Sequence, residues 1–570
     1  MIVDTKVYVE EGDRKLEDGE EKAKFKPVDQ KLLKKEHKAL KEMATEGMEK
    51  EFISVEDSLN MVPPEPRAGR MYMNSKDHKP VDKDTGVPPW REVISCSGAN
   101  TEGASKVVNH YLNPTNKKVP SYLEDTRHML CKLRTINQQQ APLPTNTRLV
   151  AIYAVAMYPS IPPEGGIVTS ERALQSSGMN QRKVQWLVRL LRKVLESNVF
   201  WWKDSLYQQC FGTAIGTSCA PPYSGLYMED LTTTAFSEWR EMHPDPDQNI
   251  KNSARLIDNG FGLWNGSLQE LREMVDYLSS KVPSMKFTWE ATCPREGCPE
   301  ASEEDHECQH FLTFLDLRLC VDGEGNIQTD LYRKPNKKCQ YLSPESEHPR
   351  HVFGNIPKSL VHSVVRNVSI PGLLEVRLEE LRLLLLSRGY KAGAVRQAID
   401  YGKGLDRDRA LEKVTREEKN KGRVRYTITY DSKLPPLPQI LSKNWKVMIQ
   451  TDQRLKKAFH APPMACLKRR PNLQDKLVRA RLPKGLGKRQ GGSRQQVGRV
   501  AGFSCCNTVL QPVPFHRGSS RQENCGEAGH YPPQWPHHPH QAGDHVQRHI
   551  LPVPPLLQEA WLPAAVLGLY

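Results

Sequence analysis

A short segment crowded with cysteine and histidine holds the densest set of potential metal ligands in the chain. Within 18 residues lie Cys293, Cys298, His306, Cys308 and His310. A structural Zn²⁺ site needs four such ligands in a tetrahedron, and the first four of these residues supply that number. Their spacing matches no established zinc motif, and the acidic run at residues 303–305 is typical of a solvated loop. The sequence favours the loop and leaves Zn²⁺ as the alternative.

A basic segment offers a second kind of chemistry. From residue 461 to residue 521, thirteen lysines and arginines stand against one acid, so this segment carries +12 of the formal net charge of +14. Concentrated positive charge is typical of proteins that bind nucleic-acid phosphates, and a solvated tail has the same composition. The residues expected to contribute to nucleic-acid binding are Arg469, Arg470, Lys476, Arg479, Arg481 and Lys484.

Strands and helices alternate around these features. Residues 149–155 (LVAIYAV) form a short apolar run, which is typical of a buried strand. Residues 255–264 place Asp258-Asn259-Gly260 between two apolar runs, which predicts a β-hairpin. Residues 180–198 repeat apolar side chains every three or four positions, which predicts a helix capped by Asn180.

The remaining elements complete an α+β pattern. We predict helices at residues 30–48 and 373–387, strands at 286–290, 312–319 and 327–333, and loops with short strands at 53–125. Strands and helices mixed in this way favour an α+β core over an all-α or an all-β fold.

Length and composition narrow the class of protein. The chain has 570 residues, which is enough for several domains. It has no run of 18 or more apolar residues and no basic, apolar leader, so we expect neither a membrane span nor a signal peptide. Thirteen cysteines without a repeating framework predict reduced thiols and a location in the nucleus or cytoplasm. The Pro- and His-rich end of the chain predicts a disordered tail.

Seven segments, in order along the chain, resemble landmarks of the reverse transcriptase of Penelope-like retroelements. They are AGRMYMNSKDHKP (68–80), REVISCSGANTEGASKVVNHYLNP (91–114), LVAIYAVAMYPSIP (149–162), QCFGTAIGTSCAPPYSGLYM (209–228), ARLIDNGFGLW (254–264), the strands within 314–342, and RRPNLQDKLVRARL (469–482). One match alone has little weight, whereas seven in the family's order indicate that residues 1–485 are similar to that family.

The resemblance implies a right-hand polymerase, a fold of fingers, palm and thumb. The fingers are expected at residues 1–148 without their upstream part, the palm at 149–342, and a helical thumb with a basic post-thumb segment at 343–485. A basic and then Pro/His-rich tail is expected at 486–570, with no GIY-YIG endonuclease. The implied activity is RNA-directed DNA polymerisation on an RNA and DNA template–primer, with Mg²⁺ as the cofactor.

The same resemblance locates the catalytic positions. In this family one aspartate of the first palm strand and two of the hairpin tip hold Mg²⁺, and here these positions are Tyr153, Asp258 and Asn259. Two metal ions hold the reacting oxygens in line, and Mg²⁺ takes hard oxygen ligands, usually carboxylates. A neutral phenol and a neutral amide do not offset the charge of a dication. The sequence therefore predicts weak Mg²⁺ binding at Asp258 and an inactive or strongly impaired enzyme.

Other positions match the family. The resemblance implies that Tyr158 packs against the sugar of the incoming nucleotide. It also implies that Gly212 and Gly216 allow the backbone to approach the template or nucleotide. Arg91 and Lys79 match positive positions of the fingers that meet phosphates, and the alternative for both is a solvated surface cation.

Three hypotheses follow. The chain is a degenerate reverse transcriptase that still binds template–primer, or an active enzyme in which another carboxylate substitutes, or a non-enzymatic nucleic-acid-binding protein acting through its basic segment. Primer extension separates the first two. Salt-dependent binding after deletion of residues 461–521 tests the third.

Overall fold

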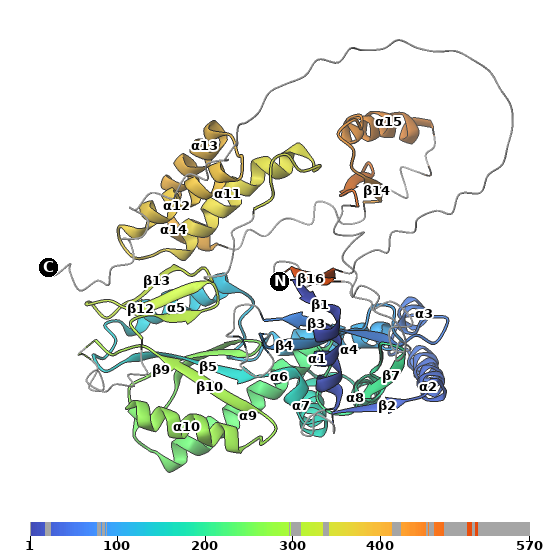
Figure 1. Cartoon of the computed structure of the whole chain (residues 1–570), viewed down its shortest axis with the longest axis horizontal. Coiled ribbons are helices and arrows are strands. Elements are labelled where there is room, and N and C mark those ends of the chain that lie inside the picture. Colours follow the sequence, from blue (N-terminus) through green and yellow to red (C-terminus); the bar gives the residue numbers. More distant parts are fainter. Residues whose placement is uncertain are drawn as a thin grey trace, which may run out of the picture. The chain divides into compact units, whose positions relative to one another are not determined.

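The computed structural model describes residues 2–17, 24–76, 81, 86, 88–295, 297, 309–334, 341–412, 423–451, 454, 461–471, 499–503 and 508–510. They form helices and antiparallel sheets in the α+β arrangement of a right-hand polymerase, as the sequence predicted (Figure 1). All of them lie in the first of two units, Met1–Val513, and the second unit, Pro514–Tyr570, is outside the described residues. No helix among the described residues is long and apolar enough to span a membrane.

The palm is a four-stranded antiparallel sheet in the order β10-β5-β9-β8. Its strands are β5 (Arg148–Val155), β8 (Lys251–Leu256), β9 (Asn259–Trp264) and β10 (Lys286–Ala291). The side chains of the inner strand β5 alternate between two cores, with Val150 and Ala154 on one face and Leu149 and Ala151 on the other. Because both faces are covered, this strand is apolar almost throughout.

Helices cover one face of the palm sheet. They are α4 (Glu102–Asn116), α7 (Pro163–Ser176), α8 (Gln181–Glu196), α9 (Ala220–Met242) and α10 (Leu268–Ser280). The predicted helix at 180–198 is confirmed as α8. The side chain of Asn180 accepts hydrogen bonds from the backbone N–H groups of Arg182 and Lys183 at 2.9 and 3.4 Å.

The prediction of loops and short strands at residues 53–125 is wrong over two helices, α3 (Val55–Met61) and α4. In α4 one face is buried at helical spacing, through Ala104, Val107, Val108 and Leu112. Gly103 and Pro114 interrupt that pattern in the sequence. Gly103 serves packing, since a Cβ there would lie 2.2 Å from the carbonyl oxygen of Asn60, and so α4 packs directly against the end of α3.

A smaller sheet and a helix complete the second core on the other palm face. They are β11 (Leu312–Phe314), β12 (Leu317–Val321), β13 (Ile327–Leu331) and α5 (Thr126–Gln140). The single strand predicted at 312–319 is wrong, because the chain turns back between β11 and β12. Leu315 takes a left-handed φ of 57° at this turn, which apolar periodicity alone does not reveal.

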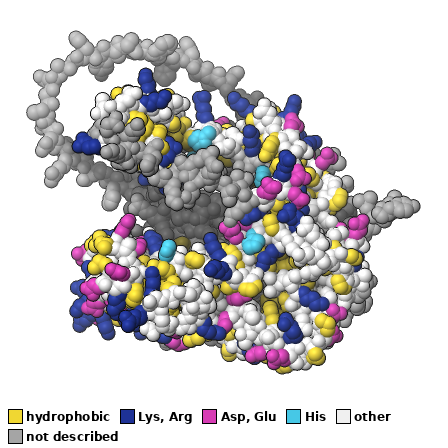
Figure 2. Space-filling view, turned by 180° about the vertical axis from the view of Figure 1, so that it is seen from behind, with side chains coloured by type: hydrophobic (Ala, Val, Ile, Leu, Met, Phe, Trp, Pro, Cys, Tyr) yellow, Lys and Arg dark blue, Asp and Glu magenta, His cyan; other side chains and the backbone are white. Residues whose placement is uncertain are grey.

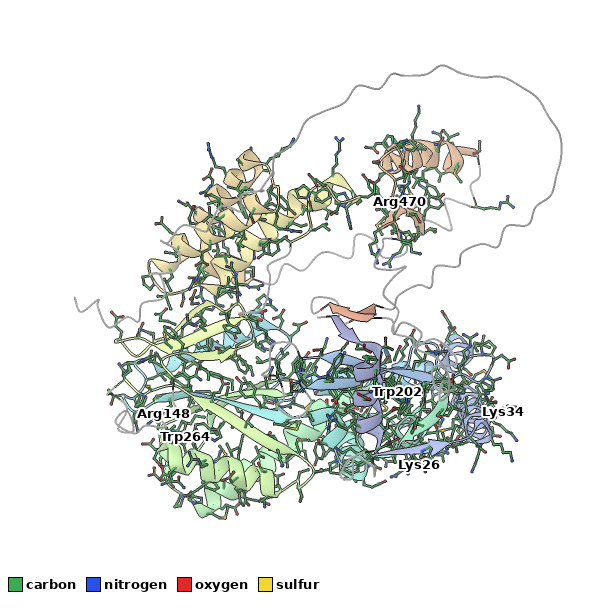
Figure 3. All side chains as sticks on the ribbon, in the orientation of Figure 1. Lys26, Lys34, Arg148, Trp202, Trp264 and Arg470 are labelled. Carbon is green, nitrogen blue, oxygen red and sulfur yellow. The ribbon has the colours of Figure 1, made fainter. Side chains whose placement is uncertain are left out.

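The fingers contain a five-stranded sheet in the order β2-β7-β6-β3-β4. Its strands are β2 (Phe25–Val28), β3 (Gly69–Ser75), β4 (Trp90–Ser95), β6 (Val199–Trp202) and β7 (Ser205–Gln209). Two of these strands thus come from within residues 149–342, the range predicted as palm. Helices α1 (Thr5–Glu17) and α2 (Gln30–Glu49) accompany the sheet, and Tyr8 of α1 packs between Trp90 and Trp202 (Figure 3).

The helical part predicted as thumb packs around its own apolar core. It contains α11 (Arg350–Asn367), α12 (Leu373–Ser387), α13 (Ala392–Lys403) and α14 (Arg407–Leu411). The predicted helix at 373–387 is confirmed as α12, and Gly389 just beyond it has a left-handed φ of 86°.

The other described elements are short or peripheral. They are β1 (Ile2–Asp4), α6 (Met157–Ser160), η1 (Pro246–Gln248), β14 (Arg425–Thr429), α15 (Leu437–Thr451), β15 (Met464–Lys468), β16 (Arg499–Phe503) and β17 (Thr508–Leu510). Strands β16 and β17 lie in the range predicted as a disordered tail, and the rest of that range is outside the described residues.

Candidate polymerase active site

The three positions predicted to hold catalytic carboxylates lie together in the palm. Tyr153 of β5 is the antiparallel partner of Asn259, the first residue of β9, so their side chains share one face of the sheet. Asp258 lies in the turn between β8 and β9, and its carbonyl oxygen accepts a hydrogen bond from the N–H of Ala154 at 3.0 Å. The preceding residue, Ile257, has a left-handed φ of 59° and so makes the hairpin turn tight.

Tyr153 is held as a neutral hydrogen-bond donor. Its hydroxyl lies 3.0 Å from the carbonyl oxygen of Thr313 in β11 and 3.3 Å from Oε2 of Glu290 in β10. Burial and then the neighbouring Glu290 charge raise the pKa of the Tyr153 hydroxyl far above its ordinary value. The side chain therefore links β5 to β10 and β11, and it offers no anionic oxygen to a metal.

These residues do not fit a Mg²⁺ centre. Asp258 is the carboxylate of the hairpin tip, Tyr153 and Asn259 are neutral, and Glu290 is already paired with the Tyr153 hydroxyl. Across the described ranges, no three His, Cys, Asp or Glu side chains come close enough to hold a metal ion. Since Mg²⁺ prefers several hard oxygen ligands, no step of catalysis is assigned to a metal at this site.

A tyrosine and an arginine from the fingers meet beside Asp258. Tyr158 belongs to α6 and is hydrogen-bonded to Ser224 of α9. Burial raises the pKa of Tyr158, the charge of Asp258 raises it further, and the positive charge of Arg91 in β4 opposes this. All three charged or titratable groups therefore act on one another at the junction of palm and fingers.

Gly212 and Gly216 join the palm to the fingers. A Cβ on Gly212 would lie 2.6 Å from backbone atoms of Pro159, and one on Gly216 would lie 2.3 Å from the carbonyl oxygen of Ile94. Both residues also have positive φ, 69° and 127°. Protein packing thus supplies a reason for both glycines, and the predicted approach to a nucleotide stays a prediction.

Sequence reasoning missed a buried arginine behind the hairpin. Arg255 of β8 donates from Nη2 to the carbonyl oxygen of Gly225 at 2.8 Å and lies 3.4 Å from Oε2 of Glu229, both in α9. Burial lowers the pKa of Arg255 and the Glu229 charge opposes this. Arg255 and Asp258 also line a cavity of about 40 Å³ between the sheet and the helices. The only signal in the sequence was an arginine inside an apolar strand.

The remaining predicted residues are partly outside the described residues. These are Lys79, Cys298, His306, Cys308, Lys476, Arg479, Arg481 and Lys484. Of the zinc alternative only Cys293 is described, and its N–H donates to the carbonyl oxygen of Gln309 at 3.0 Å.

Two of the predicted nucleic-acid-binding arginines are described. Arg469 and Arg470 are exposed and directly follow β15, where Arg470 is labelled in Figure 3. Arg470 forms an ion pair with Asp431, so part of its charge is already balanced within the chain. On the face in Figure 2, Lys and Arg side chains are interspersed with Asp and Glu.

Comparison with known proteins supports the class of fold. The model of the family described as animal helix-turn-helix domain matches residues 340–400, and no curated protein matches the chain. The telomerase of Candida albicans, solved with a fragment of telomeric RNA, has a TM-score of 0.39 at 10% identity. The similarity covers 61% of this chain and 58% of that one.

Viral polymerases give similar values. The RNA-dependent RNA polymerase of a human picobirnavirus has a TM-score of 0.39 at 15% identity, over 60% of this chain and 64% of that one. The Sicinivirus RNA-dependent RNA polymerase has a TM-score of 0.35 at 12% identity, over 61% and 70%. The chain has a reverse-transcriptase-like polymerase fold, and at these scores no activity follows from the likeness.

Proposed function

We propose that this chain is a reverse transcriptase of the Penelope-like retroelement class that has lost most or all of its RNA-directed DNA polymerase activity. It retains binding of an RNA and DNA template–primer and acts in the nucleus or cytoplasm. The observation that carries the proposal is the pairing of Tyr153 with Asn259 beside Asp258. Two of the three positions that need a carboxylate are neutral, and Mg²⁺ binding at the third is weak.

The expected loss of rate is large. Metal-ion stabilisation supplies several kcal/mol of the barrier, and each ~1.4 kcal/mol corresponds to about tenfold in rate. A site with one carboxylate lacks most of that contribution. Binding of template–primer does not need the metal ligands, because phosphates are bound chiefly by cations such as Arg91.

Restoring the carboxylates tests the proposal. The double variant Tyr153→Asp, Asn259→Asp rebuilds three carboxylates around Asp258 and should extend a DNA primer on an RNA template with excess Mg²⁺. Tyr153→Phe combined with Asn259→Asp is the matched control, since it also removes the phenol and restores only one carboxylate. Residues acting as a unit are strongly non-additive, so the control and the single variants should give little extension.

The structure adds a second readout to this experiment. Tyr153→Asp removes the donor of Glu290 and places a second carboxylate on the neighbouring strand, so the variant should be less stable without a cation. Mg²⁺ should then raise the melting temperature of the double variant and leave that of the unmodified chain unchanged. Extension by the unmodified chain contradicts the proposed loss. A folded double variant that binds primer–template yet adds no nucleotide contradicts the assignment of the defect.

The second candidate is a non-enzymatic nucleic-acid-binding protein that acts through its basic segment. The supporting observation is that Arg469 and Arg470 lie exposed at the end of β15. Reversing the charge of Arg469, Lys476, Arg479 and Arg481 should flatten the salt dependence of nucleic-acid binding. An unchanged slope would identify this segment as a solvated tail.

A further inference from the structure

Helices α12 and α13 have the connection of a helix-turn-helix. Four residues, Arg388–Lys391 in sequence, join the two helices, and Gly389 among them has a φ of 86°. A short turn containing glycine is typical of this motif, in which the second helix enters the major groove of DNA. In Figure 1, α11, α12 and α13 lie side by side as one helical group.

One face of α13 is fixed against α11. Val395, Ala398 and Ile399 are buried in the helical core. Gly402 lies so close that a Cβ would be 2.2 Å from Cγ1 of Val361. This packing fixes the rotation of α13 about its axis, and therefore fixes which residues face outward.

The outward face carries unengaged donors. Arg396 and Gln397 are exposed, and within the described residues neither side chain has a hydrogen bond or an ion pair. Lys391 and Lys403, at the two ends of the helix, are also exposed. Asp400 is the acid on this face, one turn after Arg396, so the face carries a net positive charge.

These side chains match the edges of base pairs. Arginine binds O6 and N7 of guanine with two hydrogen bonds, and glutamine binds N6 and N7 of adenine in the same way. The first turn of α13, Ala392-Gly393-Ala394, has small side chains that leave Arg396 and Gln397 as the most protruding polar groups. The terminal lysines are placed to meet phosphates, which position a protein without reading sequence.

We propose that α13 binds in the major groove of B-form duplex DNA, with Arg396 and Gln397 on base edges. This site goes beyond the proposed template–primer binding of the palm. An A-form duplex does not suit it, since the deep, narrow major groove of A-form RNA helices does not admit side chains. The ligand is therefore double-stranded DNA, and an RNA duplex or RNA–DNA hybrid of the same sequence is the comparison.

The test uses the full chain and a pool of random-sequence duplex DNA. Repeated selection should enrich a short sequence containing G and A, and its affinity relative to random DNA is measured at physiological salt by fluorescence anisotropy. Arg396→Ala should lower that preference by about 5- to 150-fold, the value of one bidentate base contact. Arg240→Ala, an equal loss of charge at an exposed position of α9, should leave the preference unchanged.

Three further variants separate base reading from charge. Arg396→Lys keeps the charge without the planar fork, so the sequence preference should fall while binding to random DNA remains. Gln397→Ala should relax the preference at one base pair, and Asp400→Asn should strengthen binding to all duplex DNA. Failure to enrich any sequence, equal affinity for the RNA–DNA hybrid, or an effect of Arg396→Ala no larger than that of Arg240→Ala overturns the proposal. Primer extension by the palm variants is independent of all these outcomes.

Discussion

The β8–β9 hairpin and the helices α11–α13 are each fixed by a buried arginine beside a carboxylate, and the two arginines are held differently. Arg377 of α12 binds Asp330 of β13 with two hydrogen bonds, at 3.0 and 2.7 Å, and these raise the pKa of Arg377. Arg255 is held chiefly by a neutral carbonyl, with Glu229 at 3.4 Å, and burial lowers its pKa. The carboxylate dominates in the first case and desolvation in the second.

That difference separates support from surface chemistry in each region. Behind the hairpin a cation is buried, while the face that would meet Mg²⁺ presents Tyr153 and Asn259, both neutral. In the helical group the ion pair is internal, and the exposed face of α13 keeps free donors such as Arg396. A fold can therefore keep its scaffold whether or not its exposed polar groups suit catalysis, because the two tasks fall on different side chains.

The largest expected effect tests the two arginines directly. Arg377→Met keeps much of the volume and leaves Asp330, which is 2% exposed, without its partner, so the free energy of unfolding should fall by about 3–5 kcal/mol. Arg255→Met leaves mainly a neutral carbonyl unpaired and should cost about 1–3 kcal/mol. Urea unfolding followed by tryptophan fluorescence measures both. Arg134→Met, in an exposed pair with Asp408, is the control and should change little.

The reverse order would break the comparison. If Arg255→Met cost more than Arg377→Met, Glu229 rather than the carbonyls would be the main partner of Arg255. A double variant Arg255→Met, Glu229→Gln separates these readings, since it removes both charges and should recover stability only if the pair dominates.

A smaller effect is expected at the altered catalytic position. Tyr153→Phe keeps the ring and removes the hydroxyl that joins β5 to Thr313 and Glu290, so the free energy of unfolding should fall by about 0.5–1.5 kcal/mol. The measurement is urea unfolding. Tyr426→Phe, at an exposed position of β14, is the matched control. A Tyr153→Phe variant as stable as the parent would mean that water replaces the hydroxyl and that Tyr153 is not a structural link.

The smallest effect concerns pH and the helical group. Burial, and then the charge of Arg366, lower the pKa of His362 in α11, so the folded state favours its neutral form. The unfolded chain takes up a proton near the ordinary value of about 6.5, so stability is lost as the pH falls from there towards the lower folded pKa. His362→Gln should therefore reduce the drop in melting temperature between about pH 7.5 and 5.5. His351→Gln, also in α11, is the control, and equal drops in both variants would contradict this account.

Local patterns in the sequence were enough for several elements of both regions. The hairpin at 255–264 and the helices α8 and α12 follow from apolar spacing, a capping Asn180 and a terminating Gly389, all of which act within a few residues. The neutral residues at two catalytic positions were also visible in the sequence, because the motifs fix the alignment without any knowledge of contacts.

Tertiary structure decided the features that depend on partners distant in the chain. Strands β6 and β7 join the fingers sheet, and Tyr153 meets Glu290 and Thr313, more than 130 residues away. Helix α4 and the turn at Leu315 were missed for the same reason, since Gly103 serves packing against Asn60 and not its own helix. Periodicity reports which face of an element is buried, and only the folded chain determines what it is buried against.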